Sequence, residues 1–435
     1  MWSHAENICA MEPCKPGGLS FFVNPKCFHA RKLTGVFRLG RHLIHSRLFS
    51  NHVHPLPIIK RVPSIFTALS LLACVPVLYT SHTMTMWKIT LAVTEYGHRL
   101  ALLPFAMAIF LMRRHRINSL LAFVAAGILC LPLFQAWQKA RTLPNEMSAA
   151  FKLQLPSNSS SPLSFFDLFF GGMSLPVPAQ TIEYANNGGG PCNLLFFPSQ
   201  TRKPAPCIIV IHGGGWDSGS AEEFLEWNHY WASEGYAVAA IEYRLAPRWH
   251  WPAQREDTAS ALAFLKTNAG KLGIDASRFV LLGRSAGGQI AGATAYALHD
   301  PAVRGCILMY APDDMPFAWK YADPSDVLDT PKLLGQYLGG SAEAVSAAYL
   351  SASATLIADA ASPPTLMVHG NRDIIVWNRQ SERLSARLNT LNVPHYYLAL
   401  PWATHGLDYP FHGPGAELTR YVVDAFLNKV VAEKN

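Results

Sequence analysis

The sequence predicts an α/β fold, in which a mostly parallel central sheet carries helices on both faces, preceded by a helical membrane region. Three observations lead to this prediction. From about residue 180, short runs rich in Val, Ile and Leu alternate with amphipathic helical stretches. Before residue 141, two long stretches contain no charged residue. Residues 1–141 carry 16 Lys and Arg against 3 Asp and Glu, whereas residues 142–435 carry 20 against 26.

The composition limits the classes of protein to consider. Half of the 435 residues are hydrophobic and 15% are charged, which excludes a disordered or collagen-like chain. The formal net charge is +7, but the positive excess lies in the first third of the chain. Because no basic stripe runs through the rest, the sequence argues against nucleic-acid binding and favours a membrane-facing front on a soluble domain.

Residues 1–61 form a basic tail that we expect to be disordered. The tail is too long and irregular for an ordinary signal peptide, and Met84 or Met86 are alternative starting points of the chain. A zinc site drawn from its Cys and His residues would have poor ligand spacing, so an unstructured tail is the preferred interpretation. The residues concerned are Cys9, Cys14, Cys27 and His29.

Residues 62–141 are predicted to be a membrane region with two to three transmembrane helices. Ile117–Gln138 has 22 residues, or about 33 Å as a helix, which matches a bilayer core, and Val62–Trp87 is also long enough. A third stretch, Ile89–Met112, contains Glu95 and Arg99 one helical turn apart, where the two side chains are expected to pair. The alternative for each stretch is a buried core helix.

The distribution of Lys and Arg predicts the orientation. Nine lie in the tail and three more, Arg113, Arg114 and Arg116, follow the third stretch. Placing both groups on the cytoplasmic side gives a multi-pass protein with three spans, and everything after Gln138 on the non-cytoplasmic side. Lys139 argues mildly against this orientation.

The remaining chain divides into a linker and one domain. Residues 142–176 are rich in Ser and Pro and then aromatic, so they are expected to be a linker whose Phe165–Phe170 segment lies at the lipid surface. Residues 177–435 are the predicted α/β domain. Within it, about 315–362 contain aromatic residues and a helical pattern between two strands, and are expected to form a small cap over the site.

Polar residues follow four of the predicted strands, and in parallel sheets chemistry gathers at the carboxyl ends of the strands. The pattern Gly283-x-Ser285-x-Gly287, on a strand–turn–helix, is typical of a nucleophile elbow, a strained turn that exposes the Ser hydroxyl. Asp373 and His405 follow two later strands, and the chain order Ser, Asp, His is that of the catalytic triad of hydrolases with this kind of sheet.

Residues of about 180–435 resemble the α/β-hydrolases, and more narrowly the hormone-sensitive-lipase-like esterases and acetyl-esterases. The resemblance rests on the runs HGGGW (212–216), YRLAP (243–247) and GRSAGG (283–288), with the late Asp and His. It says little about residues 1–176. Arg284 departs from the family pattern, in which Asp is common before the nucleophile.

The resemblance implies two-step acyl transfer. Ser285 would attack an ester carbonyl, His405 would act as base and then acid, and Asp373 would orient the imidazole and stabilise its charge. The family pattern places an oxyanion hole at the backbone N–H groups of Ala286, Gly214 and Gly215. No cofactor is implied, and no metal-ligand spacing appears in this half of the chain.

Other assignments stay open at this stage. Asp313 and Asp314 follow a strand where some hydrolases carry their acid, although Asp373 is preferred. His212 is expected to orient the glycine loop, and Asp257 to be a structural carboxylate. Trp216 and Trp319 are candidates for the substrate pocket, with core packing as the alternative.

Three functions fit the sequence. The preferred one is a membrane-anchored serine carboxylesterase or lipase-like hydrolase acting on a small or lipid-like ester. The second is an acyltransferase or deacetylase that acts on an envelope lipid or glycan with the same triad. The third is a non-catalytic membrane interaction protein on a hydrolase scaffold.

Overall fold

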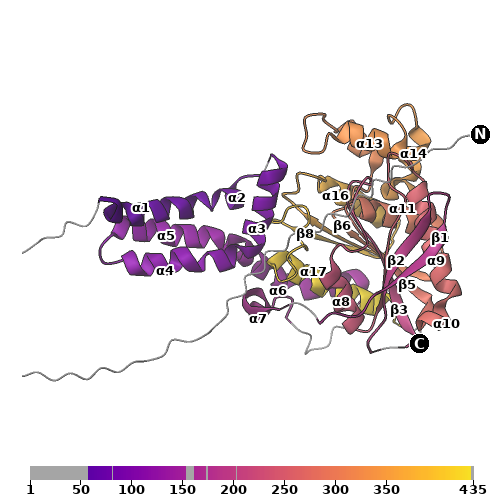
Figure 1. Cartoon of the computed structure of the whole chain (residues 1–435), viewed down its shortest axis with the longest axis horizontal. Coiled ribbons are helices and arrows are strands. Elements are labelled where there is room, and N and C mark those ends of the chain that lie inside the picture. Colours follow the sequence, from indigo (N-terminus) through magenta and orange to yellow (C-terminus); the bar gives the residue numbers. More distant parts are fainter. Residues whose placement is uncertain (1–56, 81, 153–160, 173–174, 202, 433–435) are drawn as a thin grey trace, which may run out of the picture. The chain divides into compact units, whose positions relative to one another are not determined.

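The computed structural model describes residues 57–80, 82–152, 161–172, 175–201 and 203–432 (Figure 1). The prediction of a disordered basic tail concerns residues that lie almost entirely outside these ranges. The described chain consists of helices up to residue 170 and of alternating strands and helices from residue 180.

An eight-stranded sheet, in the order β1-β2-β4-β3-β5-β6-β7-β8, forms the centre of the α/β region. Its strands are β1 (Gln180–Asn186), β2 (Pro191–Phe197), β3 (Ala205–Ile211), β4 (Ala237–Ile241), β5 (Ile274–Arg284), β6 (Val303–Met309), β7 (Thr365–Gly370) and β8 (His395–Leu400). The pairs β1–β2 and β2–β4 are antiparallel, and the other pairs are parallel. The predicted α/β-hydrolase fold is therefore confirmed, and each predicted strand is a strand.

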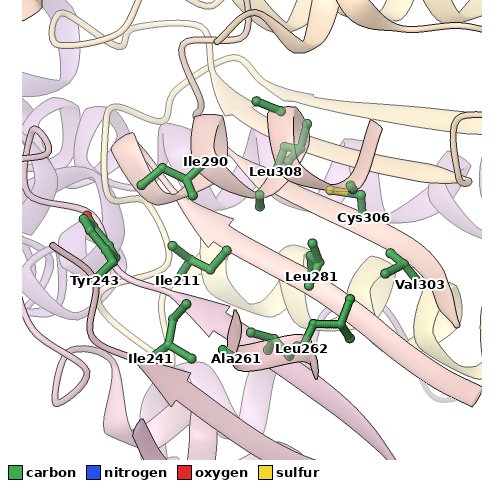
Figure 2. Packing of buried hydrophobic residues seen from close by; sticks show 14 of the residues in the cluster. Ile211, Ile241, Tyr243, Ala261, Leu262, Leu281, Ile290, Val303, Cys306 and Leu308 are labelled. Atoms are coloured by element: carbon green, nitrogen blue, oxygen red, sulfur yellow. The ribbon is translucent and has the colours of Figure 1, made fainter. Parts of the chain in front are cut away.

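The apolar runs form central strands because both faces of the sheet are covered. In β3, Ile209 and Ile211 pack into one core cluster, whereas Ile208 and Val210 pack into the other. This is the two-residue alternation of a strand, with apolar side chains at every position because neither face meets water. Figure 2 shows the first cluster, in which Ile211 and Leu281 lie beneath Ile290.

Helices cover both faces of the sheet. The first cluster includes residues of α9 (Ala253–Thr267), α11 (Ala286–Leu298) and α16 (Arg379–Thr390). The second includes residues of α6 (Leu131–Phe151), α8 (Leu225–Ser233) and α17 (Pro414–Val430). The short α10 (Ala269–Leu272) precedes β5.

Four short helices between β6 and β7 occupy the segment expected to be a cap. They are α12 (Met315–Lys320), α13 (Thr330–Leu338), α14 (Ser346–Ser351) and α15 (Ala354–Ile357). Phe317 and Leu333, from the first two of these helices, line the cavity that contains Ser285, so the segment does border the site.

The helical region before the sheet packs into a small bundle. Its elements are α1 (Pro57–Leu72), α2 (Val75–Leu78), α3 (Met84–Leu100), α4 (Leu102–Leu111), α5 (Arg116–Leu129) and the later α7 (Phe165–Phe170). Ser119 of α5 donates a hydrogen bond to the carbonyl of Ala108 in α4 at 2.7 Å, and Asn118 donates to Ser64 of α1 at 3.3 Å. The start of α5 therefore lies beside the middle of α1.

The structure changes two expectations for this region. Among the described residues, Arg61–Leu78 is long and apolar enough to cross a membrane, whereas the predicted span Ile117–Gln138 is divided between α5 and α6, which meet at a 42° bend. α6 continues to Phe151, and its residues from Ala136 onward pack beneath the sheet. The boundary expected at residue 141 and the start of the linker therefore fall inside a helix, because an apolar face of α6 buries itself against the α/β domain.

Glu95 and Arg99 do not pair with each other as expected. Glu95 accepts hydrogen bonds from Trp402 Nε1 at 3.1 Å and from the N–H of Gly415 at 2.7 Å. Arg99 donates from Nε to the carbonyl of Leu168 at 2.6 Å. The Glu95 and Arg99 side chains therefore bind other parts of the chain, and α3 is docked on the α/β domain.

Candidate active site

Ser285 occupies the sharp turn between β5 and α11. Its backbone has φ 53° and ψ −122°, a conformation that costs energy for any residue with a side chain. The turn requires glycine on both sides, since a Cβ on Gly283 would lie 2.0 Å from the carbonyl oxygen of Gly287, and one on Gly287 would lie 2.2 Å from that of Ile211. The predicted nucleophile elbow is thus present in its geometry.

The loop after β3 brings backbone N–H groups to the same place. Gly214 and Gly215 have φ values of 98° and 59°, in the region that favours glycine, and both line the cavity beside Ser285. Ala286 lines it too, and as the first residue of α11 its N–H has no acceptor within the helix.

His212 holds this loop in place. Its Nδ1 lies 2.8 Å from the carbonyl oxygen of Gly213, and its ring stacks on Tyr243 with centroids 4.2 Å apart. The Tyr243 hydroxyl donates to the carbonyls of His212 and Gly213. His212 is buried and occupies the orienting position that the sequence predicts for it.

Asp373 and His405 form a buried hydrogen-bonded pair. His405 Nδ1 lies 2.7 Å from Asp373 Oδ2, and the other carboxylate oxygen accepts the N–H groups of Ile375 and Val376 at 2.8 and 2.9 Å. Burial opposes ionisation, but the charge of His405 and hydrogen bonds from His369 and His405 lower the pKa of Asp373 well below its usual range. Because an ionised carboxylate only accepts hydrogen bonds, the proton of this pair lies on Nδ1 of His405.

All six residues predicted for catalysis line one cavity of about 1480 Å³. They come from the ends of β3, β5, β7 and β8, or from the loops that follow those ends, and are Gly214, Gly215, Ser285, Ala286, Asp373 and His405. Neighbouring parallel strands end at the same edge of a sheet, which is why residues so distant in sequence meet here.

The two alternative acids lie in other environments. Asp314 caps α12 through the N–H of Phe317 and accepts two hydrogen bonds from Arg383, at 2.9 and 2.7 Å. Asp313 is fully buried; burial and the charge of Asp314 raise its pKa well above the usual range. The carboxylate that binds His405 is Asp373, so the geometry favours Asp373 as the acid.

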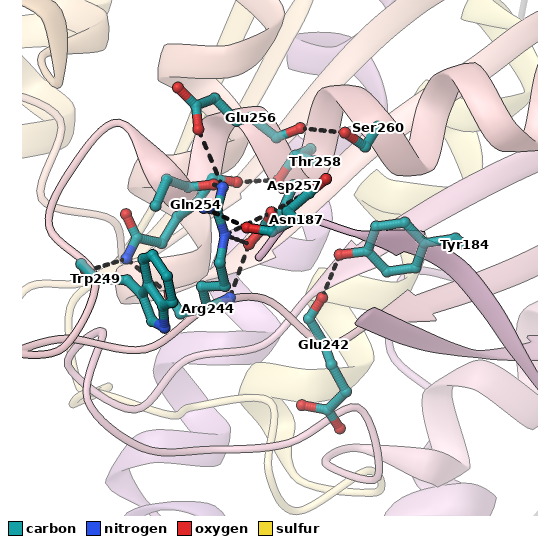
Figure 3. Close-up of polar contacts among 11 residues, drawn as sticks. Tyr184, Asn187, Glu242, Arg244, Trp249, Gln254, Glu256, Asp257, Thr258 and Ser260 are labelled. Carbon is teal, nitrogen blue, oxygen red and sulfur yellow. Dashed lines mark hydrogen bonds and ion pairs between the residues drawn. The ribbon is translucent and has the colours of Figure 1, made fainter. Parts of the chain in front are cut away.

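Asp257 is structural, as the sequence predicts. Its carboxylate accepts hydrogen bonds from the side chain and the backbone N–H of Arg244, at 2.8–3.0 Å, and from Asn187 (Figure 3). Arg244 also binds Glu256 at 3.0 Å. This network fixes the YRLAP run to the start of α9 and lies apart from the residues that line the cavity.

The two tryptophans proposed for the pocket differ in position. Trp216 lines the cavity, but it is 4% exposed, stacks on Tyr337 and donates from Nε1 to Gln289 at 2.9 Å. Among the described residues around the cavity Trp319 is missing; its Nε1 donates to Glu343 of the cap at 3.2 Å. The expectation that Trp319 lines the pocket is therefore not met, because its ring packs within the cap against Tyr349.

Arg284 is unusual in the sequence, but the residue that it pairs with in the structure was not predicted. Arg284 Nε lies 2.6 Å from Asp408 Oδ2, with both side chains buried. The other oxygen of Asp408 accepts from the hydroxyl of Tyr310 at 2.7 Å, and the Tyr310 ring packs edge-on against His405 with centroids 4.5 Å apart. The only signal for Asp408 in the sequence is its position three residues after His405.

The contribution of α3 to the cavity was also missed. Trp87 and Leu91 line the cavity, and Trp87 Nε1 donates to the carbonyl of His405 at 3.1 Å. In the sequence both residues lie in or beside the predicted membrane stretches, because an apolar residue can face either lipid or the wall of a protein cavity. Glu95 was the available signal, because a carboxylate in an apolar helix needs partners.

Comparisons with known proteins agree with this geometry. The BD-FAE family model matches residues 194–388, a range that contains Ser285 and Asp373 and ends before His405. Esterase LipC of Mycobacterium tuberculosis is 27% identical over 247 residues, which is 52% of this chain and 59% of LipC. Carboxylesterase NlhH of the same organism is 34% identical over 132 residues, 29% of this chain and 40% of NlhH.

A solved structure titled "Bacterial Heroin Esterase" superposes with a TM-score of 0.51 at 23% identity, covering 68% of this chain and 92% of that one. This likeness concerns the fold. The chain spans about 59% or less of the length of the two curated relatives named above. Together these findings show that the chain is similar to esterases and support the α/β-hydrolase fold.

Proposed function

We propose that this protein is a membrane-anchored serine carboxylesterase, with Ser285 as nucleophile, His405 as general base and acid, and Asp373 as its orienting partner. The observation that carries the proposal is that the strained Ser285 and the buried Asp373–His405 pair line the same cavity. The names of the relatives support a carboxylic ester as the substrate.

The reaction proceeds through an acyl-enzyme. His405 accepts the Ser285 proton as Oγ attacks the ester carbonyl, and the tetrahedral intermediate collapses with the proton passing to the leaving alcohol. Water, activated by the same imidazole, then cleaves the acyl-enzyme and releases the acid. The N–H groups of Gly214, Gly215 and Ala286 stabilise the oxyanion in both steps, each contributing on the order of 10²–10³ in rate.

Hydrolysis of p-nitrophenyl butyrate by the full-length protein and by Ser285→Ala tests this proposal. Loss of the nucleophile is expected to lower turnover by about six orders of magnitude, because the triad acts as a unit. Ser277→Ala, at an exposed position in the same strand, is the matched control and should retain activity. Activity that persists unchanged in Ser285→Ala contradicts the assignment.

Membrane anchoring is supported by the surface of the helical bundle. Six large apolar side chains on α1, α4 and α5 are 60–80% exposed, namely Leu69, Leu72, Leu103, Phe110, Ile117 and Leu120. Exposed apolar surface of this extent is costly in water and typical of contact with lipid. We therefore assign α1, α4 and α5 as the membrane-embedded part; α3, docked on the α/β domain, lies outside it.

The end of the helical bundle that lies farthest from α3 carries basic side chains. Arg61, at the start of α1, and Arg113, Arg114 and Arg116, around the α4–α5 turn, are exposed there. α4 and α5 are shorter than a bilayer core, so snorkelling of these arginines and local thinning would accompany insertion. By the positive-inside rule, the basic end is cytoplasmic and the catalytic domain non-cytoplasmic.

A further inference from the structure

One face of α3 forms part of the wall of the substrate cavity. Met84, Trp87, Leu91, Ala92 and Tyr96 all line it. Successive members are one, three or four residues apart, which keeps all five along one side of the helix. An element that precedes the α/β domain by almost a hundred residues thus borders the same cavity as Ser285.

The same helix holds the loop that carries His405. Besides the Trp87 hydrogen bond to the His405 carbonyl, a Cβ on Gly406 would lie 3.7 Å from Trp87 and 3.9 Å from Leu91, so the backbone of this loop packs directly on α3. Glu95, one turn after Leu91, accepts from Trp402 at the start of the loop. The position of His405 therefore depends on contacts with α3.

The Asp373 loop is held from the same side. Arg372, the preceding residue, donates to the carbonyl oxygen of Val77 at 2.6 Å and to that of Tyr79. Both acceptors lie at the end of α2, immediately before α3. The two loops that carry the acid and the base are thus both tied to the α2–α3 segment.

The charge around the cavity limits its ligands. Besides Asp373, five carboxylates line it, from Asp217, Glu222, Glu223, Asp323 and Asp326, against the cationic side chains of Lys88 and Arg284. Arg284 is already paired with Asp408. An anionic ester would be repelled at this rim, whereas an uncharged one would not.

We propose that α3 is a component of the active site, which provides the wall for the apolar chain of an uncharged long-chain ester and positions His405. This inference rests on the esterase function proposed above. The volume of about 1480 Å³ exceeds the 300–1,000 Å³ typical of sites for small ligands, so it accommodates a long chain beside the reacting ester. The apolar face of α3 is the surface that such a chain would cover.

The experiment narrows the cavity at α3 and measures the chain-length preference. Ala92 is exposed and lines the cavity, so Ala92→Trp fills space where the distal chain would lie. The ratio of kcat/KM for p-nitrophenyl dodecanoate to that for the butyrate should fall about tenfold or more, because even one methylene changes such ratios by 10–200-fold. Ala92→Leu should give an intermediate ratio. Met86→Trp, exposed on the opposite side of the same helix and absent from the cavity lining, should leave the ratio unchanged.

The outcomes separate this inference from the proposed function. A wild-type ratio in Ala92→Trp, in protein that still reacts with a fluorophosphonate at Ser285, overturns the role of α3 while leaving the esterase intact. Faster hydrolysis of dodecanoyl-CoA than of 1-monododecanoylglycerol overturns the preference for uncharged esters. Absence of both hydrolysis and Ser285 labelling in the wild type would instead reject the esterase itself.

Discussion

At the scale of single residues, the pair Arg284–Asp408 joins the turn of Ser285 to the loop that carries His405. Arg284 precedes Ser285, Asp408 follows His405 by three residues, and the two are 2.6 Å apart. The Arg284 guanidinium also lies 4.1 Å from the centre of the Phe224 ring. The arginine that departs from the family pattern is therefore paired with a buried carboxylate, that of Asp408, which neutralises its charge.

Removing one member of this buried ion pair should destabilise the protein, because the charge of the other member is then left unpaired. Asp408→Asn leaves a buried guanidinium without its counter-charge, and the free energy of unfolding should fall by about 3–5 kcal/mol. Asp300→Asn breaks the ion pair between Asp300, which is 22% exposed, and Lys266, which is 36% exposed. This substitution should lower the free energy of unfolding by less than about 1 kcal/mol. Thermal unfolding of the two variants measures the difference, and equal losses would contradict the importance of the buried pair.

At the scale of elements, the docking of α3 on the α/β domain depends on a fully buried carboxyl group, that of Glu95. Glu95 has no exposed surface, and it binds Trp402 and the N–H of Gly415. Burial raises the pKa of Glu95 to about 8, against the lowering effect of these two hydrogen bonds and with a further increase from the charge of Asp408. The protonated form is therefore favoured in the folded protein at neutral pH.

This raised pKa gives a pH dependence of defined sign. Between the unfolded value of about 4.3 and the folded value of about 8, the folded state binds the extra proton, so the stability contributed by Glu95 is present at acid pH and is lost as pH rises. Glu95→Gln has no such proton, and its melting temperature should fall less than that of the wild type between pH 5 and 8.

Glu183→Gln, an exposed position in β1, is the control for this measurement. A slope in Glu95→Gln equal to those of the wild type and of the control would show that Glu95 does not titrate in this range. The same series, followed through the dodecanoate-to-butyrate ratio, would report whether α3 loosens as Glu95 ionises.

At the scale of the whole molecule, the division of charge corresponds to a division of structure. The excess of Lys and Arg lies before residue 142, and the described part of that region is the helical bundle, which exposes apolar side chains; the acidic remainder contains the α/β domain. The α2–α3 segment connects the two through hydrogen bonds to the loops of Asp373 and His405. The helical bundle and the cavity that contains Ser285 therefore share one structural element.

The orientation of the molecule is testable with fluorophosphonate probes in intact cells. If the catalytic domain is non-cytoplasmic, a membrane-impermeant probe should label Ser285 as completely as a permeant one, because the positive end of the bundle stays inside. Ser285→Ala defines the unlabelled background. Labelling by the permeant probe alone would place the domain on the cytoplasmic side and reverse the proposed topology.

Local pattern accounts for most of what the sequence determined by itself. The eight strands follow from short apolar runs, and the elbow from small residues around Ser285, because alternation and turn geometry are imposed within a few residues. The candidate triad followed from the chain order and from the rule that strand ends share one edge of the sheet.

Tertiary structure decided what depended on contacts between distant residues. It placed Asp373 rather than Asp313 or Asp314 on His405, gave Arg284 its partner, and moved Trp319 out of the pocket. The bond from Trp87 to His405 joins residues 318 positions apart, and a run of apolar residues is compatible equally with lipid and with a protein wall. Whether lipid or protein surrounds a helix depends on which other elements pack against it. The sequence pattern of a single segment does not contain that information.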